Sequence, residues 1–457
     1  MLDTPIHRLV PRMALPSIAG MLVTSAYNLA DTFFVSQLGT NATGAVGVNS
    51  SIDIIIMMAG SLFAVGAASY TSRLLGAKKD HHARVVLSTC FYIALMLGGL
   101  VLVLGTIFQK PMLYMLGAND ALLPYSEQYC RYILLAAPFM ASSFVLNQCL
   151  RAEGSAIYSM IGMVTGAVLN IGLDPLFIFT FGWGVAGASA ATAISKLVSW
   201  CILMLPYWRH RTLLTIKVSQ IRMRWDDLFE VCSMGSSSFF RNLLSTVASI
   251  VLNRMAIVYG ESALAAVSVA NRVTMFLTSA CLGFGQGFQP VAGFSWGAQR
   301  YDRVRKAYRF SCFACVIGIS AAAALVAVFA KPLLLLFTED DTELVRIGVF
   351  SLRIQCLAMP FHGFGIVTNM LCAGIGRALP SLLLGISRQG ICFFPILPIV
   401  SRLWGVQGIA AVQGISDMLV LFLAVPIGLT IMRDVRQKEA VQGQNPPVDP
   451  GSLNISH

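Results

Sequence analysis

Charged side chains are scarce in this chain. Asp, Glu, Lys and Arg make up 12% of its 457 residues, whereas an ordinary soluble domain carries about 25%. Hydrophobic residues make up 56%, the mean hydropathy is +0.73, and apolar runs extend from residue 13 to residue 432. Because no polar stretch is long enough to form a sizeable soluble domain, the sequence predicts one integral membrane domain whose solvent is lipid.

The sequence also lacks the patterns of familiar catalytic and cofactor sites. It has no Ser-His-Asp set, no His-Glu-x-x-His and no phosphate-binding loop, and its cysteines stand singly except for Cys312 and Cys315 within one apolar run. Gly283, Gly285 and Gly287 follow no strand, so this string favours close helix packing over nucleotide binding. We therefore expect no enzyme, no cofactor and no resident metal ion.

Twelve apolar segments are long enough to cross a bilayer, which takes about 20 residues. Helix is the expected form of each, because a chain in hydrocarbon must satisfy its own backbone hydrogen bonds and no segment alternates as a barrel strand does. We predict spans that begin near Met13, Val46, Val86, Tyr129, Tyr158, Gly184, Ser233, Val267, Phe310, Val349, Leu379 and Gly405.

Basic residues are distributed unevenly between the two sides of this predicted bundle. Most of the 32 Lys and Arg residues lie in the termini and the even-numbered loops, in short clusters such as those within 73–84, 209–224 and 300–309. The positive-inside rule then predicts cytoplasmic termini and a multi-pass protein of the cytoplasmic (inner or plasma) membrane. These clusters account for the net charge of +11, and since they form no continuous patch we expect no nucleic-acid partner.

The two halves of the chain repeat at a constant spacing. Gly76-Ala77 after the second span recurs as Gly297-Ala298 after the eighth, a shift of 221 residues (297 minus 76). The shift also relates Gly39 to Gly260, Gly66 to Gly287, Arg84 to Arg305, Gly184 to Gly405, Gly187 to Gly408 and Ser195 to Ser416, and a shift of 222 relates Asn147 to Asn369 and Gly154 to Gly376.

This duplication predicts the fold class. Because each copy has six spans, an even number, both copies enter the membrane in the same orientation, and parallel repeats enclose a central cavity suited to alternating access. We therefore expect an all-α integral membrane protein with twelve transmembrane helices in two parallel six-helix repeats, or lobes. Residues 1–220 form the N-terminal lobe with a cytoplasmic linker, residues 221–435 form the C-terminal lobe, and residues 436–457, rich in Gln, Pro, Gly and Asn, are expected to be disordered.

Two aspartates lie deep in predicted spans, where an ionisable group is costly and needs a reason. Asp31 is in the first span with Tyr27 one turn before it, and Asp174 is in the fifth with Asn170 one turn before it and Met163 about two turns further back. Helical spacing places each set on one face. Two carboxylates that face one another in a low-dielectric pocket favour uptake of a proton or a sodium ion; the alternative is that each bonds a neighbouring helix.

The second copy lacks both carboxylates, because the shift takes Asp31 to Leu252 and Asp174 to Pro395 or Ile396. A structural role would more often be kept in both copies, so the asymmetry favours one ion site in the first lobe. Pro16 and Pro175 remove backbone donors from the same two spans and mark places where a helix can bend, so we expect both to act as hinges.

Other charges in the spans remain ambiguous. Each could line the cavity, pair with another helix or extend to the membrane interface. They are Asp53, Lys196, Arg241, Arg254, Arg272, Arg353, Arg388 and Asp417, with His362 as an isolated polar residue of the tenth span.

At this point the chain resembles the multidrug and toxic compound extrusion (MATE) transporters over nearly its full length. The resemblance rests on the duplicated spans, on Ala-Asp-Thr-Phe-Phe-Val at 30–35, on the Gly-Ala after the second and eighth spans, and on Gly-Val-Ala-Gly-Ala-Ser-Ala at 184–190. Within the family it looks like the DinF-type branch, whose ion site implies roles for Asp31, Asn170, Asp174 and Thr192. The family also implicates Tyr27 and Asn147 in the cavity.

The resemblance implies an antiporter that takes up protons or sodium and expels bulky amphipathic, often cationic, drugs. Soft and aromatic walls, including Met163, would suit such guests. We expect protonation of Asp31 and Asp174 to bend the first helix near Pro16 and to release the drug outward. A monomer in the lipid bilayer is the expected form.

The alternative function is a lipid-linked oligosaccharide flippase of related topology. Such a protein would favour a more basic cavity, and Arg241, Arg254 and Arg272 keep this alternative open.

Overall fold

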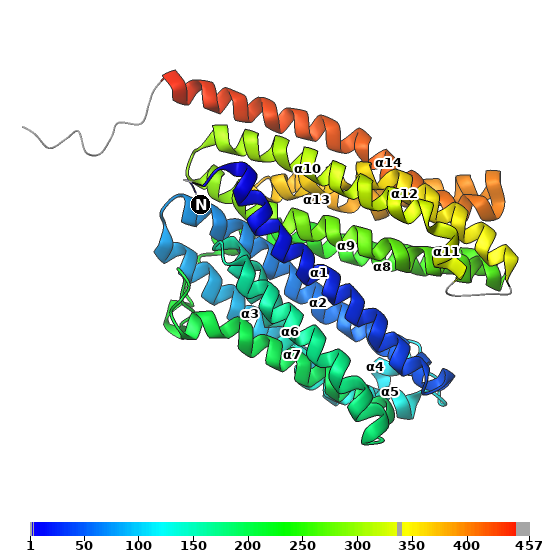
Figure 1. Cartoon of the computed structure of the whole chain (residues 1–457). Helices are drawn as coiled ribbons and strands as arrows, with labels where there is room; N and C mark the ends of the chain where they lie inside the picture. The colour runs from blue at the N-terminus through cyan, green and yellow to red at the C-terminus, as the bar shows by residue number, and fades with distance from the viewer. Residues whose placement is uncertain (1, 3, 336–340, 445–457) are drawn as a thin grey trace, which may run out of the picture.

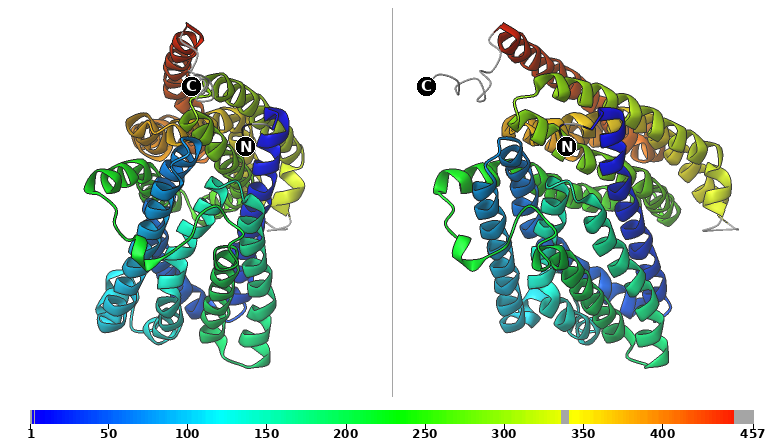
Figure 2. Two further views of the ribbon diagram at one scale, coloured as in Figure 1. Left: turned by 90° about the vertical axis from the view of Figure 1, so that its left-hand side faces the viewer. Right: turned by 60° about the vertical axis from the view of Figure 1, so that its left-hand side comes forward.

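The computed structural model describes residues 2, 4–335 and 341–444 and is built from helices in two bundles (Figures 1 and 2). The first bundle, the N-lobe, contains α1 (Ile6–Ser36), α2 (Thr40–Gly76), α3 (Asp80–Ile107), α4 (Gln109–Met115), α5 (Leu123–Ala152), α6 (Ala156–Pro175), the π-helix η1 (Leu176–Thr180) and α7 (Gly184–Trp208). The second, the C-lobe, follows the short η2 (Val218–Gln220) and contains α8 (Trp225–Ile257), α9 (Glu261–Gly297), α10 (Tyr301–Val328), α11 (Ala330–Leu335), α12 (Thr342–Gly374), α13 (Ala378–Ile386), the π-helix η3 (Ser387–Ile391) and α14 (Phe393–Gln444).

The predicted twelve-helix, two-lobe membrane fold is confirmed. Within the described residues, ten helical segments are long and apolar enough to cross a membrane. The last of them, Ala378–Gln442, contains the eleventh and twelfth spans, which meet at a kink where Gly405 has φ 56° and ψ −129°. The remaining span is α8, which is not among the ten and carries Arg241 and Arg254.

The duplication is also visible in the backbone. Positive φ angles recur at related positions, where glycine is favoured because it has no Cβ to collide with the chain. The pairs are Gly39 (103°) with Gly260 (110°), Gly154 (91°) with Gly376 (83°), Gly184 (54°) with Gly405 (56°), and Lys78 (59°) with Gln299 (58°). The two lobes therefore share turn geometry as well as helix order.

The lobes touch at the end of the bundle that holds the N-terminus and diverge toward the other end (Figure 1). Glycine makes this approach possible on α2 and α8. A Cβ on Gly66 would collide with the carbonyl oxygen of Val231, and a Cβ on Gly235 would collide with the carbonyl oxygen of Leu62. Small residues let helix backbones approach closely in membranes, so this end of the interface depends on these two positions.

Polar contacts join the lobes at the same end. Arg73 of α2 forms an ion pair with Glu230 of α8, with 2.6 Å between Nη1 and Oε1. Asp227 of α8 accepts a hydrogen bond from the Tyr70 hydroxyl at 2.7 Å and lies 3.1 Å from Nε2 of His82. The contacts hold the start of α8 against α2 and α3.

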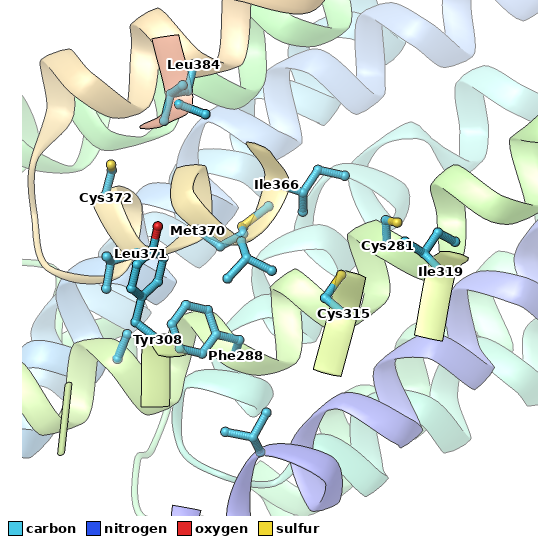
Figure 3. Packing of buried hydrophobic residues seen from close by; sticks show 14 of the residues in the cluster. Cys281, Phe288, Tyr308, Cys315, Ile319, Ile366, Met370, Leu371, Cys372 and Leu384 are labelled. Carbon is cyan, nitrogen blue, oxygen red and sulfur yellow. The ribbon is translucent and has the colours of Figure 1, made fainter. Parts of the chain in front are cut away.

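An apolar core lies between α9, α10, α12 and α13 of the C-lobe and extends to Leu9 and Met13 of α1 (Figure 3). Phe288 is fully buried there beside Tyr308 and Met370. Cys315 belongs to this core together with Cys281. Buried cysteines pack as small apolar residues, and the cluster as a whole joins α1 to the helices of the C-lobe.

The expected disorder of residues 436–457 is wrong for its first part, because α14 continues as a helix to Gln444. Strong helix formers occupy this stretch, and two contacts hold it to the bundle. Arg305 Nη2 lies 3.0 Å from Glu439 Oε1, and Lys438 Nζ lies 4.5 Å from the centre of the Trp296 ring. Residues 445–457 lie outside the described residues.

We predict that Gly235→Ala destabilises the protein by about 1–3 kcal/mol, because the added methyl meets a helix backbone that cannot rotate away as a side chain can. The matched control is Gly318→Ala in α10, where a Cβ meets nothing within 4 Å. This control should gain about 0.5–1 kcal/mol from reduced chain entropy. Thermal unfolding in one detergent compares them, and a Gly235→Ala midpoint at or above that of the wild type would contradict the packing argument.

Candidate functional site

Three polar side chains meet on α6 and α7 of the N-lobe: the amide of Asn170, the carboxyl group of Asp174 and the hydroxyl of Thr192. Nδ2 of Asn170 donates to Oδ1 of Asp174 at 3.3 Å and to Oγ1 of Thr192 at 3.3 Å. All three side chains are buried, and Asp174 is 0% exposed. The one-turn spacing of Asn170 and Asp174 explains their contact, and the packing of α7 on α6 supplies Thr192.

Asp31 of α1 completes this cluster, because its carboxyl group interacts with that of Asp174. Oδ1 of Asp31 and Oδ2 of Asp174 are both buried and have no hydrogen-bond donor among the described residues. Buried oxygens of this kind are rare in folded proteins. The structure therefore brings together all four residues predicted for ion coupling and leaves two of their oxygens free to accept a proton or to bind a cation.

Two charged residues that the sequence left ambiguous belong to the same region. Lys196 of α7 donates from Nζ to the Tyr27 hydroxyl at 2.8 Å and lies 4.8 Å from the centre of the Tyr27 ring. It also interacts electrostatically with Asp31 and with Asp53 of α2. Sequence spacing could not assign Lys196 and Asp53 to this site, because they lie on α7 and α2 and only packing brings them to Asp31 and Tyr27 of α1.

The charges of this region do not balance. Asp31, Asp53 and Asp174 would contribute three negative charges against the one positive charge of Lys196. An excess of negative charge is costly in a membrane interior, and protons or a bound cation would remove it. The arrangement can therefore take up positive charge reversibly, which is the chemistry that ion coupling requires.

A cavity of about 500 Å³ lies between the lobes beside this cluster. Its volume is in the range of sites for drug-sized molecules, and its wall includes the side chains of Met21, Met57, Met140, Met163 and Phe144. Tyr27, Asn147 and Met163, the three residues predicted for the cavity, all line it. Asn170 and Thr192 also form part of the wall, so the cluster and the cavity are contiguous.

The predicted cavity residues lie at two different depths. Asn147 accepts a hydrogen bond from Ser159 at the start of α6, with 3.0 Å between the oxygen atoms. Asp174 lies at the other end of that helix, roughly 22 Å away at 1.5 Å per residue. Asn147 therefore does not contact the carboxyl groups, and its place is near the closed end of the cavity.

The two expected hinges differ in their local structure. Pro16 lies inside α1, which stays helical from Ile6 to Ser36. Pro175 ends α6 and is followed directly by the π-helix η1. A π-helical turn often marks a functional position, so Pro175 stands where the fifth span changes its helical geometry.

The C-lobe holds a polar cluster in which the charges are paired, unlike those of the N-lobe cluster. Arg388 of η3 bonds Asp417 of α14 through two nitrogen–oxygen pairs, at 2.5 and 3.1 Å, and Nδ1 of His362 lies 3.5 Å from Asp417. The 221-residue shift relates Asp417 to Lys196. Corresponding positions of the two lobes thus carry opposite charges, and the C-lobe pair neutralises itself.

The other arginines that the sequence left ambiguous fall into two groups by position. Arg241 lines the cavity, whereas Arg254, Arg272 and Arg353 are exposed and are not among its lining residues. The basic residues that could have favoured a flippase therefore do not gather at one site.

The chain was compared with known proteins. The MatE family profile matches residues 16–176 and 237–399. The chain is 28% identical over 448 residues to the "Multidrug export protein MepA" of Staphylococcus aureus (strain MRSA252), which covers 96% of this chain and 98% of that one. The protein of the same name from Staphylococcus saprophyticus is 27% identical over 418 residues, with 90% and 92% covered.

Solved structures with the same fold are also similar. A structure described as the outward-facing conformation of a multidrug resistance MATE family transporter of the MOP superfamily has a TM-score of 0.90 at 26% identity, and the match covers 95% of this chain and 98% of that one. A MOP superfamily transporter from Pyrococcus furiosus, described as having a binding pocket of reverse polarity that suggests a different function, has a TM-score of 0.89 with the same identity and coverage.

We predict that the Arg388–Asp417 pair is structural. Asp417→Leu should destabilise the protein by about 1–3 kcal/mol, because it leaves the half-buried Arg388, whose side chain is 23% exposed, without its counter-charge. The double variant Arg388→Met, Asp417→Leu should recover most of this loss, since an apolar pair of similar volume avoids the desolvation cost. Thermal unfolding of Asp417→Leu, Arg388→Met and the double variant tests this. A double variant as unstable as Asp417→Leu would argue against it.

Proposed function

This chain belongs to the MatE family of membrane transporters, and we propose that it is a cation-coupled multidrug efflux antiporter. It takes up protons or sodium ions and exports amphipathic, often cationic, small molecules by alternating access. The observation that carries this proposal is the contiguity of two sites. Asn170 and Thr192 belong both to the carboxyl cluster and to the wall of the cavity between the lobes.

Contiguity supplies a physical basis for coupling. When Asp31 and Asp174 are ionised, they attract a cationic guest into the cavity, and Tyr27 offers it an aromatic face. When a proton or a sodium ion neutralises the pair, that attraction is lost. Drug and coupling ion therefore compete through charge, which is how binding of one can lower the affinity for the other.

The closed end of the interface supports an assignment of which side of the membrane the cavity faces. The basic loops predict that both termini are cytoplasmic, and the lobes touch at the end that holds the N-terminus. In that orientation the cavity faces outward and the glycine contacts of α2 and α8 form a cytoplasmic seal. Bending of α1 near Pro16, and of the fifth span at Pro175, would shrink the N-lobe part of the cavity and expel the guest.

Support for drug export over oligosaccharide flipping comes from the relatives. They are named multidrug export proteins, and this chain aligns with them over nearly their full length. The cavity is also bounded by Met and Phe side chains that adapt to varied guests. We place the protein in the cytoplasmic membrane as a monomer, in the DinF-like branch whose ion-site residues it shares.

The proposal predicts that an imposed gradient of the coupling ion drives ethidium transport by the purified protein in liposomes. Asp31→Asn and Asp174→Asn should each abolish this movement, because an amide cannot take up or release a proton and binds sodium without charge. A proton gradient and a sodium gradient are imposed in separate experiments, and ethidium fluorescence reports transport. The gradient that drives it identifies the coupling ion.

The matched control is Asp226→Asn, because Asp226 is a carboxylate whose side chain is 86% exposed at the start of α8. This variant should transport ethidium like the wild type. If neither gradient drives ethidium movement in the wild type, or if both buried variants retain full coupled efflux, the antiporter proposal is wrong and the flippase becomes the better candidate.

A further inference from the structure

Two arginines, one from each lobe, line the cavity between the lobes. Arg151 is the penultimate residue of α5 and is 3% exposed. Its Nε and Nη1 atoms have no hydrogen-bond partner among the residues that the structure describes. A buried guanidinium normally makes several hydrogen bonds, so this side chain presents unused donors at the cavity wall.

The neighbouring carboxylate does not neutralise Arg151. Glu153, two residues later, is also buried, but both of its oxygens have other donors. The Tyr207 hydroxyl donates to Oε1 at 2.8 Å, and the backbone N–H of Leu214 donates to Oε2 at 3.3 Å. Glu153 thus ties the end of α5 to the linker that follows α7.

Arg241 of α8 is in a similar position on the other lobe. Its hydrogen bond within the described structure goes to the Ser238 hydroxyl at 3.1 Å, an uncharged group of the same helix. Asp417 is held by Arg388, and the positive charge of Arg388 also acts on Arg241. Arg241 therefore faces the cavity without a carboxylate of its own.

Asp53, the carboxylate on the cavity wall, forms no ion pair with Arg241 within the described residues, and the charges that act on it are those of Lys196 and Asp31. Asn242, next to Arg241, donates to the Ser61 hydroxyl of α2, which fixes the level of Arg241 along that helix. Asp53 lies eight residues before Ser61, or roughly 12 Å at 1.5 Å per residue. The cavity is therefore polarised, with carboxylate at one level and guanidinium at the other.

Two further side chains of the cavity wall have unused donors. Gln289 of α9 and Ser381 of α13 line the cavity and are buried. Nε2 of Gln289 and Oγ of Ser381 have no hydrogen-bond partner within the described residues. An anion placed here would meet donors from both lobes, which are the groups that carboxylates, sulfonates and phosphates bind.

We propose that Arg151 and Arg241 form a subsite for an anionic group of the transported molecule, so that zwitterionic amphiphiles are preferred over plain cations. The cationic end of such a guest lies toward Asp53 and Tyr27, and its carboxylate, sulfonate or phosphate lies at the guanidinium donors. This inference rests on the proposed export function and names its substrate class. It follows because an anion would satisfy buried donors that a purely cationic guest would leave unpaired and repel.

The test compares two dyes that differ in one group. Tetramethylrhodamine as the free acid is a zwitterion, and its methyl ester is a cation with the same fluorophore. Equilibrium binding to the purified full-length protein in a neutral detergent is measured by fluorescence anisotropy. We expect the wild type to bind the acid more tightly than the ester.

Arg151→Gln and Arg241→Gln should each weaken binding of the acid by about tenfold or more, as expected for loss of a charge-assisted contact. Each should leave binding of the ester nearly unchanged. The matched control is Arg254→Gln, which removes the same charge from an exposed position of α8 and should affect neither dye. If Arg151→Gln fails to fold, Arg241→Gln, whose side chain is less buried, decides the question.

Three results would overturn the proposal: equal or weaker binding of the acid by the wild type, equal loss of both dyes in the arginine variants, or the same loss in Arg254→Gln. The measurement needs no ion gradient, so it is independent of coupling. Ethidium efflux with no preference for the acid would reject this subsite alone. A preference for the acid without gradient-driven efflux would reject the antiporter and retain the subsite.

Discussion

The cost of placing charge inside a membrane organises this structure. Each ionisable group in a span must find a counter-charge, reach the interface or serve a reversible function. Arg254, Arg272 and Arg353 lie on exposed faces, and Arg388 and Asp417 neutralise one another. Within the described residues, the groups that have neither a counter-charge nor an exposed position are the carboxyl cluster of the N-lobe, Arg151 and Arg241, and they lie in or beside the cavity between the lobes.

A symmetric backbone therefore carries asymmetric chemistry. The same turns recur in both lobes, down to the positive φ angles of Gly184 and Gly405, because turn geometry is set by the chain and does not depend on what the cavity binds. Side chains at corresponding positions have diverged. Lys196 and Asp417 occupy one repeated position with opposite charges, so one lobe can exchange a cation while the other keeps a fixed ion pair.

The interface between the lobes explains how such a molecule can be closed at one end and open at the other. Gly66 and Gly235 let α2 and α8 meet backbone to backbone, and Arg73 with Glu230 adds an ion pair at the same end. The apolar cores cross this interface, since the C-lobe core includes Leu9 and Met13 of α1 and the N-lobe core includes Val231 of α8. Rocking of two lobes about such a contact is the motion that alternating access requires.

The sequence by itself determined the helices and their number, because apolar length and the need for internal hydrogen bonds leave no other choice in lipid. It also determined the duplication and the candidates Asp31, Asn170, Asp174 and Thr192, whose helical spacing and family resemblance are local signals. Tertiary structure alone decided which lone charges matter. Lys196, Asp53, Arg151 and Arg241 come from different helices, and only packing shows that Arg388 has a carboxylate partner while Nε and Nη1 of Arg151 have none among the described residues. The helical end of α14 was missed for the same reason, since its contacts with Arg305 and Trp296 are distant in the chain.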